Sequence, residues 1–422
     1  MIKTYKNSLI NEQVKVYKHK SGLEVYVCEK PEFSSSFAIF GTRYGSIDTK
    51  FSVNGGKITE VPEGIAHYLE HKLFESEELD AFARFAKTGA SANAFTSFDR
   101  TCYLFSCSTN FEENFKILLD FVQHPYFTEE TVRKEQGIIG QEIQMYDDSA
   151  PWQVLMNLLG ALYKEHPIRI DIAGTVESIA KINADLLYDC YNTFYNLNNM
   201  FICVAGNIDA KNVFDLCDKL LQTKEPVEIQ RFMPKEENQV EKEKVEVTLP
   251  VSKPLFAIGF KEKCENPTKT LKEKVLSEII LKCIFGNDSL LYKELFDSKL
   301  INDSFGAEYF NGYGYACSII EGESDYPEKV KEVINRYLNT YLEKGILEED
   351  IKRAVKVYYS EEVCGFNSAE NIVMNMVECA FNKTEVFEEF DIIKNITQED
   401  VAKRLKEMFD ISNSSISIVN KE

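Results

Sequence analysis

Residues 62–75 read PEGIAHYLEHKLFE. Proline and glutamate at the start of this stretch favour a helix, because both residues suit a first helical turn. Residues three and four positions apart lie on one face of a helix, so His67, Glu70 and His71 share a face. Two imidazoles four residues apart can bind one tetrahedral zinc ion, and the carboxylate between them lies beside the metal without having to bind it. The pattern, HxxEH, therefore predicts a zinc site with Glu70 as a catalytic base.

A second predicted helix, residues 128–147, offers a third ligand. Thr128 is suited to cap its first turn. Two carboxylates, Glu135 and Glu142, fall on or beside its apolar stripe, two turns apart. Carboxylates placed against an apolar face are costly unless they are paired or bind a metal. The alternative is that the histidines and glutamates of both helices are simply solvated.

A site with three protein ligands and one open position is the catalytic arrangement of zinc. Zinc lowers the pKa of a bound water and polarises a carbonyl group, while a nearby glutamate takes the proton from the water and passes it to the leaving amine. This chemistry predicts hydrolysis of amide bonds, with Glu70 as the proton carrier.

Residues 89–96 read GASANAFT and are predicted to form a strand with small side chains. Small side chains let another extended backbone approach closely, so the strand is a candidate for binding a peptide substrate. A plain edge strand packed on a helix accounts for the same residues equally well. The candidate substrate-binding residues are Ala92, Asn93, Ala94, Phe95 and Thr96.

The length of 422 residues exceeds what one hydrophobic core usually organises. Strand patterns near the start and the end of the first half recur in the second half, with 165 positions from Ile39 to Val204 and 160 from Ile258 to Ile418. We therefore expect an α+β fold of two similar halves. The expected boundaries are a metal-binding half at 1–222, a linker rich in Glu and Lys at 223–244, and a half without metal at 245–422.

Charge and composition exclude several classes of protein. All five histidines precede residue 167, so the second half cannot carry a histidine-based metal site. A net charge of −20 disfavours nucleic acid as a partner. It could favour cationic peptides, or the acidic residues could simply keep the protein soluble. No apolar run predicts a signal peptide or a membrane span, and the eleven cysteines are expected to be reduced thiols, so we expect a cytoplasmic protein.

The sequence resembles the pitrilysin/insulinase family of zinc metallopeptidases, the inverzincins, and in particular its short bacterial members related to mitochondrial processing peptidase. The resemblance covers essentially the whole chain. Three segments carry it most specifically: HYLEH at 67–71, NAFT at 93–96 and EQGIIGQE at 135–142.

The resemblance assigns roles to individual residues. It implies that His67, His71 and Glu142 bind one zinc ion per chain and that Glu70 is the general base. It also implies that Glu135, seven positions before Glu142, supports the zinc site without binding the metal itself.

The resemblance further implies the architecture and the mode of substrate binding. Each of two homologous halves should be a mostly antiparallel sheet covered by helices, as in processing-peptidase-like metallohydrolases. Two chains, or four halves, should close around a peptide, which adds as a strand at 93–96.

One feature of the family is missing. Catalytic members usually place an arginine and, about seven residues later, a tyrosine in the second half, where they reach the substrate. The matching stretch, 294–305, reads ELFDSKLINDSF, and no arginine occurs between Arg231 and Arg336. We therefore expect a homologous second subunit that supplies this Arg–Tyr pair. Possible substitutes within the chain are Tyr309, Tyr313 and Lys299.

A second function remains open, because the same family contains inactive subunits that bind peptides or serve as scaffolds. Such subunits usually lose residues of the zinc site. The HxxEH pattern and the distal glutamate are all present in this chain, which favours an enzyme.

Overall fold

The computed structural model describes residues 1–263 and 267–422. The chain forms two compact units, and neither is continuous in sequence. Unit 1 comprises Met1–Ile143, Asp171–Phe232 and Glu362–Glu388, and unit 2 comprises Gln144–Ile170, Met233–Glu361 and Glu389–Glu422. Both units combine a sheet with helices, so the expected α+β class is confirmed.

Unit 1 is built on a seven-stranded sheet with the order β1-β2-β3-β9-β4-β8-β7. Only β3 and β9 are parallel neighbours in it. The strands are β1 (Ile2–Asn7), β2 (Glu12–Lys18), β3 (Glu24–Glu29), β4 (Ser36–Thr42), β7 (Ser91–Thr96), β8 (Thr101–Cys107) and β9 (Met200–Gly206). A small second sheet consists of β10 (Ile229–Arg231), β5 (Lys50–Val53) and β6 (Thr59–Glu60).

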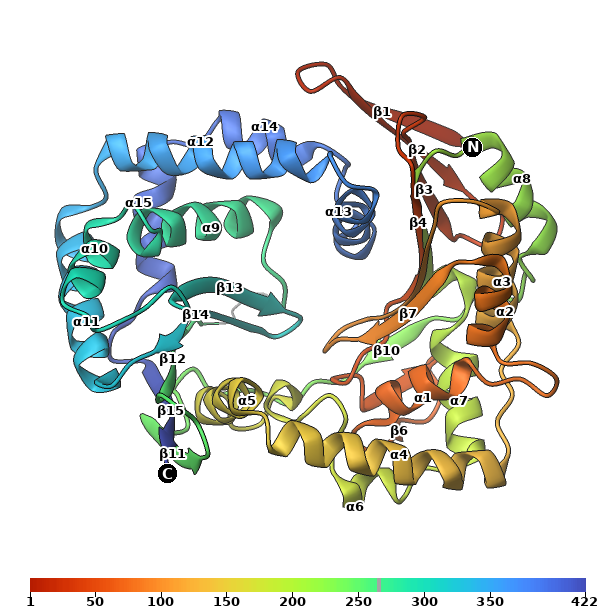
Figure 1. Cartoon of the computed structure of the whole chain (residues 1–422), viewed down its shortest axis with the longest axis horizontal. Helices are drawn as coiled ribbons and strands as arrows, with labels where there is room; N and C mark the ends of the chain where they lie inside the picture. Colours follow the sequence, from red (N-terminus) through yellow and green to blue (C-terminus); the bar gives the residue numbers. More distant parts are fainter. Residues whose placement is uncertain (264–266) are drawn as a thin grey trace. The chain divides into compact units, whose positions relative to one another are not determined.

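Helices cover both faces of the large sheet in unit 1. Figure 1 shows α13 on one side of the sheet and α2, α3 and α8 on the other. The helices of unit 1 are α1 (Ile65–Leu73), α2 (Ala81–Thr88), α3 (Phe111–Gln123), α6 (Val176–Ile179), α7 (Ala184–Phe194), α8 (Ala210–Leu220), α13 (Ala369–Asn382) and the greater part of α4 (Glu129–Asp147). The main core lies between the sheet and the helices opposite α13, and strands β3, β4, β8 and β9 contribute fully buried apolar side chains to it.

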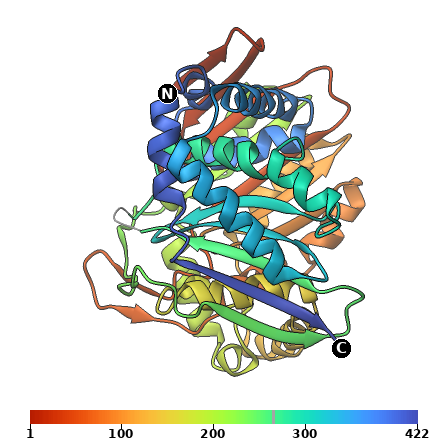
Figure 2. The same cartoon turned by 90° about the vertical axis from the view of Figure 1, so that its left-hand side faces the viewer.

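Unit 2 is built on a five-stranded sheet with the order β11-β15-β12-β14-β13. The long C-terminal strand β15 (Ser414–Lys421) runs through this sheet in Figure 2. The other strands are β11 (Lys244–Leu249), β12 (Leu255–Lys261), β13 (Gly306–Gly312) and β14 (Tyr315–Glu323). The helices are α5 (Ala150–Leu162), α9 (Leu271–Phe285), α10 (Leu290–Asp297), α11 (Pro327–Lys344), α12 (Glu348–Gly365), α14 (Glu388–Lys394) and α15 (Gln398–Met408).

The two sheets repeat one arrangement, which can be followed residue by residue. In unit 1, Arg43 N donates to Asn199 O at 3.2 Å, and in unit 2, Lys261 N donates to Asn413 O at 3.2 Å. The strand residues next to these matching bonds pair with residues on the neighbouring strands. The paired residues form one row across each sheet, and the two rows are equivalent. The rows are Met200, Thr42, Thr101 and Thr96 in unit 1, and Ser414, Phe260, Ser318 and Tyr309 in unit 2.

Each unit contains one helix that comes from a distant part of the sequence. We call these two helices, α5 and α13, the exchanged helices. Helix α13 comes late in the chain but packs on β4 and β9 of unit 1, and α5 comes early but packs on β12 and β15 of unit 2. Charged groups hold both segments. In unit 1, Arg43 donates to Ala380 O, and Arg100 binds Glu378 and lies 4.0 Å from the ring centre of Phe381.

In unit 2, the carboxylate of Glu236 accepts three consecutive backbone N–H bonds, from Lys164, Glu165 and His166, at 3.0, 2.8 and 2.7 Å. These anchors and the exchanged helices explain why the compact units differ from the contiguous ranges 1–222 and 245–422 expected from the sequence. Within the segment 223–244, β10 pairs with β5.

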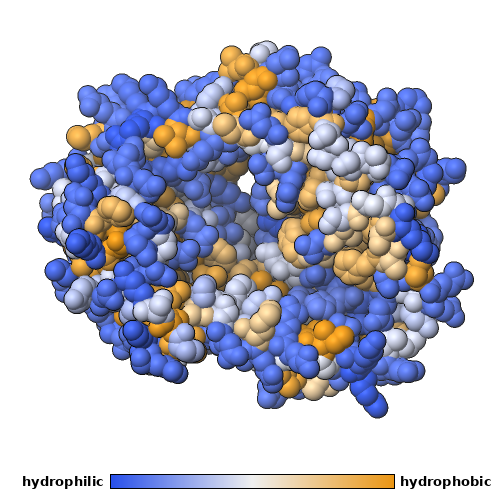
Figure 3. Space-filling view, in the orientation of Figure 1, coloured by the Kyte–Doolittle hydropathy of each residue, from blue (hydrophilic) through white to orange (hydrophobic). Residues whose placement is uncertain are grey.

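Of the strands in the described residues, seven were not predicted from the sequence: β1, β5, β6, β8, β10, β13 and β14. In the described ranges, no helix has both the length and the apolar character needed to span a bilayer. The face seen in Figure 3 is mainly hydrophilic, with hydrophobic areas among the hydrophilic ones.

Candidate metal centre

Helix α1 carries the HxxEH pattern, and a glycine fixes where it begins. Gly64, its N-cap, has φ +85°, a left-handed conformation that favours glycine. A Cβ at this position would lie 2.3 Å from Ala173 O, so the backbone of residues 173–174 packs directly on the start of the helix. The helix therefore begins at Ile65, three residues later than the predicted start at Pro62.

The structure brings three candidate ligands together. Nε2 of His67 lies 3.6 Å from one carboxylate oxygen of Glu142, and Nε2 of His71 lies 3.3 Å from the other. The donor atoms of these residues all lie within 4.8 Å of one another. Within residues 1–263 and 267–422, this is the one such group of three or more His, Cys, Asp or Glu side chains.

Glu135 lies behind the candidate ligands. Its carboxylate oxygen is 3.0 Å from Nδ1 of His71, and its side chain is buried. A carboxylate in this position favours the tautomer with a proton on Nδ1, which leaves Nε2 of His71 free to bind a metal. His67 has no equivalent support, because its buried Nδ1 has no hydrogen-bond partner among the described residues.

The electrostatics of this group favour a cation. Burial disfavours the charged form of His71, but hydrogen bonds to Glu135 and Glu142 outweigh it and raise the pKa of His71 to about 10. Hydrogen bonds from His67 and His71 hold the pKa of Glu142 well below its usual range. Two imidazoles and one carboxylate, with a second carboxylate behind them, are a donor set that suits Zn²⁺.

Tyr68 fixes the distance between the two helices that supply the ligands. Its side chain is fully buried, and its hydroxyl donates to the carbonyl of Val132 in α4. This bond joins α1 to α4, one turn before Glu135. Sequence reasoning did not single out Tyr68, although a tyrosine between the two histidines, on the helix face turned toward the core, is a usable signal.

Glu70 faces the strand that was proposed to bind substrate. Its carboxylate accepts a hydrogen bond of 2.6 Å from the hydroxyl of Thr96, the last residue of β7. β7 is the edge of the seven-stranded sheet, paired with β8 alone among the described strands. The predicted edge strand and the predicted base are therefore adjacent.

The backbone of β7 presents hydrogen-bonding groups at its open edge. Ser97 N donates to Arg100 O and closes the β7–β8 hairpin. Because such bonds alternate along an antiparallel pair, the backbone groups of Thr96, Ala94 and Ala92 point away from β8. In agreement, Ala94 N–H bonds to the side chain of Asn93 at 2.9 Å.

The side chains of Ala92 and Ala94 pack against the core of unit 1. They therefore have a structural role as well as a place on the open edge, whereas Asn93 is exposed and Phe95 is half-buried. β7 is thus an edge strand packed on the core, and its part in substrate binding stays a prediction.

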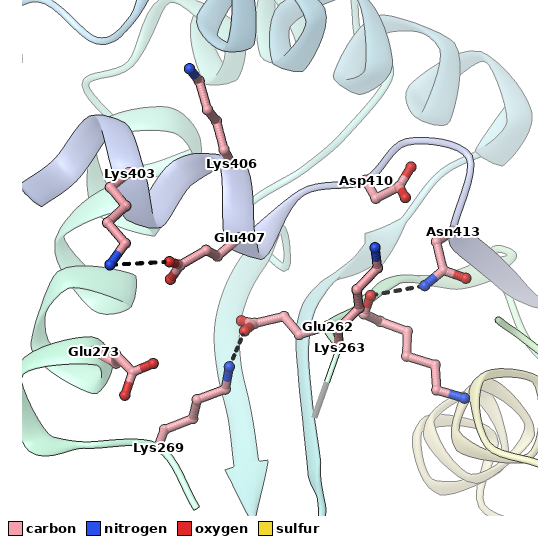
Figure 4. Close-up of a pocket in the computed structure, with 10 residues that line it drawn as sticks. Glu262, Lys263, Lys269, Glu273, Lys403, Lys406, Glu407, Asp410 and Asn413 are labelled. Atoms are coloured by element: carbon pink, nitrogen blue, oxygen red, sulfur yellow. Dashed lines mark hydrogen bonds and ion pairs between the residues drawn. The ribbon is translucent and has the colours of Figure 1, made fainter. Parts of the chain in front are cut away.

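Unit 2 contains a polar pocket lined mainly by lysines and acidic residues (Figure 4). Its buried wall is an ion-pair network. Arg404 donates to both oxygens of Glu262 at 2.9 and 2.7 Å, and Lys269 lies 2.7 Å from the same carboxylate. Because these buried charges neutralise one another, we regard the network as structural.

The same network accounts for Tyr309, one of the three residues considered as substitutes for the missing Arg–Tyr pair. Tyr309 is buried, and its hydroxyl accepts from Arg404 at 2.7 Å and bonds to Glu262. It is therefore committed within unit 2. Tyr313 and Lys299 are exposed.

Two family models and several known proteins match this chain. The sequence model described as insulinase (peptidase family M16) matches residues 48–176, and the model described as the peptidase M16 inactive domain matches residues 181–358. The chain is 41% identical over 418 residues to a Bacillus subtilis protein described as the uncharacterized zinc protease YmfH, which covers 96% of each chain.

Solved structures share the fold. A crystal structure from Alicyclobacillus acidocaldarius, described as M16-like, matches with a TM-score of 0.93 and 34% identity, covering 97% of this chain and 99% of that one. A protease from Helicobacter pylori matches with a TM-score of 0.82 over 97% of this chain and 99% of that one, at 18% identity, which shows likeness of fold alone.

Proposed function

Because the chain belongs to the insulinase family of peptidases, peptidase family M16, we propose that it is a zinc-dependent endopeptidase acting on extended peptides or unfolded segments. The observation that carries the proposal is the group of donor atoms from His67, His71 and Glu142, within 4.8 Å of one another. Glu70 lies on the same helix, between the two histidines. We assign one zinc ion to this group.

When bound, zinc supplies a water of lowered pKa and polarises the scissile carbonyl. The protein supplies the proton transfer. Glu70 accepts a proton from the attacking water as the new C–O bond forms, and it returns that proton to the amide nitrogen as the C–N bond breaks. Glu135 holds His71 in the tautomer and orientation that binding requires.

The open edge of β7 supports an extended substrate. Recognition by strand addition needs a free backbone in the partner, so we propose that flexible peptides are cleaved and that compact folded proteins are not. The outward backbone groups of Ala92, Ala94 and Thr96 would pair with the peptide. Bulky replacements at Ala92 or Ala94 should lower peptide binding, and they should also cost stability because both methyl groups pack on the core.

We also propose that full activity needs a homologous second subunit. Stabilising the developing oxyanion requires donors, and loss of one donor typically costs about 10²–10³ in rate. No arginine lies between Arg231 and Arg336, and Tyr309 is bound to Arg404 and Glu262. A partner that carries an Arg–Tyr pair would supply these donors.

We place the protein in the cytoplasm. Ten cysteines in the described ranges are free thiols, which suits a reducing compartment. Cys264 lies outside the described residues.

The proposal is tested by zinc analysis together with hydrolysis of a flexible fluorogenic peptide. The wild type should carry about one zinc per chain and cleave the peptide. Glu70→Gln should keep the zinc and lose turnover, while Glu130→Gln, on the exposed side of α4, should retain both.

Each assay is repeated with the closest encoded paralogue added. A zinc-loaded wild type that binds the peptide but never cleaves it, alone or with the paralogue, would favour the alternative of a non-catalytic scaffolding subunit. Full activity of the isolated chain, undiminished in variants of Tyr313 and Lys299, would contradict the need for a partner.

A further inference from the structure

We propose that Thr96 is a positioning residue that holds the base Glu70 in its working orientation, an inference that rests on the function proposed above. The Thr96 hydroxyl donates to a carboxylate oxygen of Glu70 at 2.6 Å. Thr96 thus does more than form part of the edge that receives a peptide backbone. It joins that edge to the residue assigned to proton transfer.

The hydroxyl proton of Thr96 is available to Glu70, because the neighbouring hydroxyl of Thr101 does not accept it at normal hydrogen-bond distance. Each threonine hydroxyl has one proton to donate. The hydroxyl of the neighbouring Thr101 is fully buried and donates to the carbonyl of Tyr44 at 2.9 Å. The two hydroxyls are 3.4 Å apart, which is long for a hydrogen bond between hydroxyls. Thr101 therefore packs beside Thr96 without competing for Glu70.

The carboxylate of Glu70 has no other hydrogen-bond partner in the described part of the chain. A half-buried glutamate with a free side chain would sample several rotamers, and only some would direct a carboxylate oxygen toward the candidate ligands. Fixing one oxygen with Thr96 restricts these rotamers and leaves the other oxygen for the reacting water. Such restriction of a catalytic group raises the fraction of molecules ready to react.

The position of Thr96 in the sheet makes this support rigid. The residue lies in the row Met200, Thr42, Thr101 and Thr96, which crosses four paired strands. Its backbone groups face the open edge, while its side chain faces α1. A peptide added at this edge would therefore contact the same residue that orients the base.

The test compares three variants for zinc content, thermal midpoint and peptide hydrolysis. Thr96→Val keeps the shape but removes the hydroxyl, and Thr96→Ser keeps the hydroxyl. Thr42→Val is the matched control, because Thr42 is a buried threonine of the same row whose hydroxyl donates to Phe194 O at 2.6 Å, away from Glu70. Crystal structures of the zinc-free wild type, Thr96→Val and Thr96→Ser give a readout independent of activity.

We expect Thr96→Val to lower kcat by about 10–100-fold, as loss of an orienting hydrogen bond does at metal sites, with KM, zinc content and thermal midpoint unchanged. Thr96→Ser should recover most of kcat. Thr42→Val should lower the thermal midpoint and leave kcat unchanged. In the zinc-free crystals, Glu70 should occupy one rotamer in the wild type and Thr96→Ser, and several in Thr96→Val.

An unchanged kcat in Thr96→Val, or a Glu70 rotamer that persists without the hydroxyl, would overturn the assignment. A wild type that hydrolyses no peptide, alone or with the paralogue, would instead count against the proposed function. In that case the rotamer comparison still decides the role of Thr96, so the two failures are distinguishable.

Discussion

Thr96 in unit 1 and Tyr309 in unit 2 occupy equivalent positions in two equivalent rows of strands, yet they serve different chemistry. Thr96 bonds to Glu70, on the helix that carries both candidate histidine ligands. Tyr309 bonds to the buried pair of Arg404 and Glu262. The same backbone arrangement therefore supports two different roles. The side chains next to each row determine whether it borders a metal site or a structural network.

The two sites also differ in how their charges are compensated. In unit 2 the carboxylate of Glu262 has two cations, Arg404 and Lys269, in direct contact. In unit 1 the partners of Glu142 are imidazoles, which are cations only while both ring nitrogens are protonated. The imidazoles around Glu142 can release protons and bind a metal ion instead. The charges around Glu262 are already compensated and need no ligand.

The largest expected effect comes from removing a candidate ligand in unit 1. His67→Ala, His71→Ala and Glu142→Ala should each lose the zinc and abolish hydrolysis, because a catalytic zinc site needs three protein ligands. Metal analysis of the purified variants and a peptide assay measure both losses. Retention of zinc in Glu142→Ala would move the third ligand elsewhere and weaken the contrast between the units.

Breaking the network of unit 2 should affect stability and leave the zinc in place. Arg404→Met removes the guanidinium that contacts both oxygens of the buried Glu262, and removing one partner of a buried ion pair typically costs about 3–5 kcal/mol. Thermal and urea unfolding measure the loss. Adding Glu262→Gln to Arg404→Met should recover part of it. Loss of zinc in Arg404→Met would contradict the separation of the two roles.

Glu135 tests whether the metal site depends on support from behind. Glu135→Ala should weaken zinc binding or activity by about 10–100-fold, because His71 loses the carboxylate that fixes its tautomer. Competition with a zinc chelator measures the affinity. Glu130→Ala, on the exposed face of the same helix, is the matched control. Equal affinities in the two variants would reduce Glu135 to an ordinary buried carboxylate.

The smallest expected effect concerns how the exchanged segments are anchored. Burial disfavours the charged form of Glu236, but the bond to Lys261 and three backbone N–H groups lower its pKa from 4.5 to about 2. Its stabilisation is therefore complete above about pH 4.5 and is lost as the pH falls through about 2. We expect Glu236→Gln to cost about 1–2 kcal/mol at pH 7, after allowance for solvent screening.

Urea unfolding of the wild type and Glu236→Gln between pH 7 and pH 2 measures this difference, which should shrink in acid. Arg100→Met, which removes an anchor of the other exchanged segment in unit 1, is the comparison. Arg100 also lies over the ring of Phe381, and this contact has no titrating partner, so part of the effect of Arg100→Met should persist at low pH. A Glu236→Gln difference that stays constant down to pH 2 would contradict the role of the ionised carboxylate.

The helical period explains what could be predicted from the sequence. It places His67, Glu70 and His71 on one face of α1, and Glu135 and Glu142 two turns apart on α4. That Glu142 faces both histidines depends on packing between α1 and α4, to which the buried bond from Tyr68 to Val132 contributes, and no local pattern encodes such a contact. Its assignment came from family resemblance.

The exchange of α5 and α13 could not be predicted for a related reason. An amphipathic pattern shows that a helix buries one face, but it does not show which sheet that face covers. The contacts that settle the matter, such as Arg100 with Glu378 and Phe381, join residues almost three hundred positions apart. The strands β13 and β14 were missed because their residues 306–323 are interrupted by glycines.

The exchanged helices also set the order in which the protein can be completed during synthesis. When a ribosome has translated residue 300, every candidate ligand of the metal centre has been made, yet the sheet of unit 1 still lacks α13 (Ala369–Asn382). Until α13 has been made, the face formed by β4 and β9 is uncovered. Its apolar side chains can then form non-native contacts. An amino-terminal fragment would share this defect permanently. Unit 1 therefore becomes complete only when nearly the whole chain has been translated.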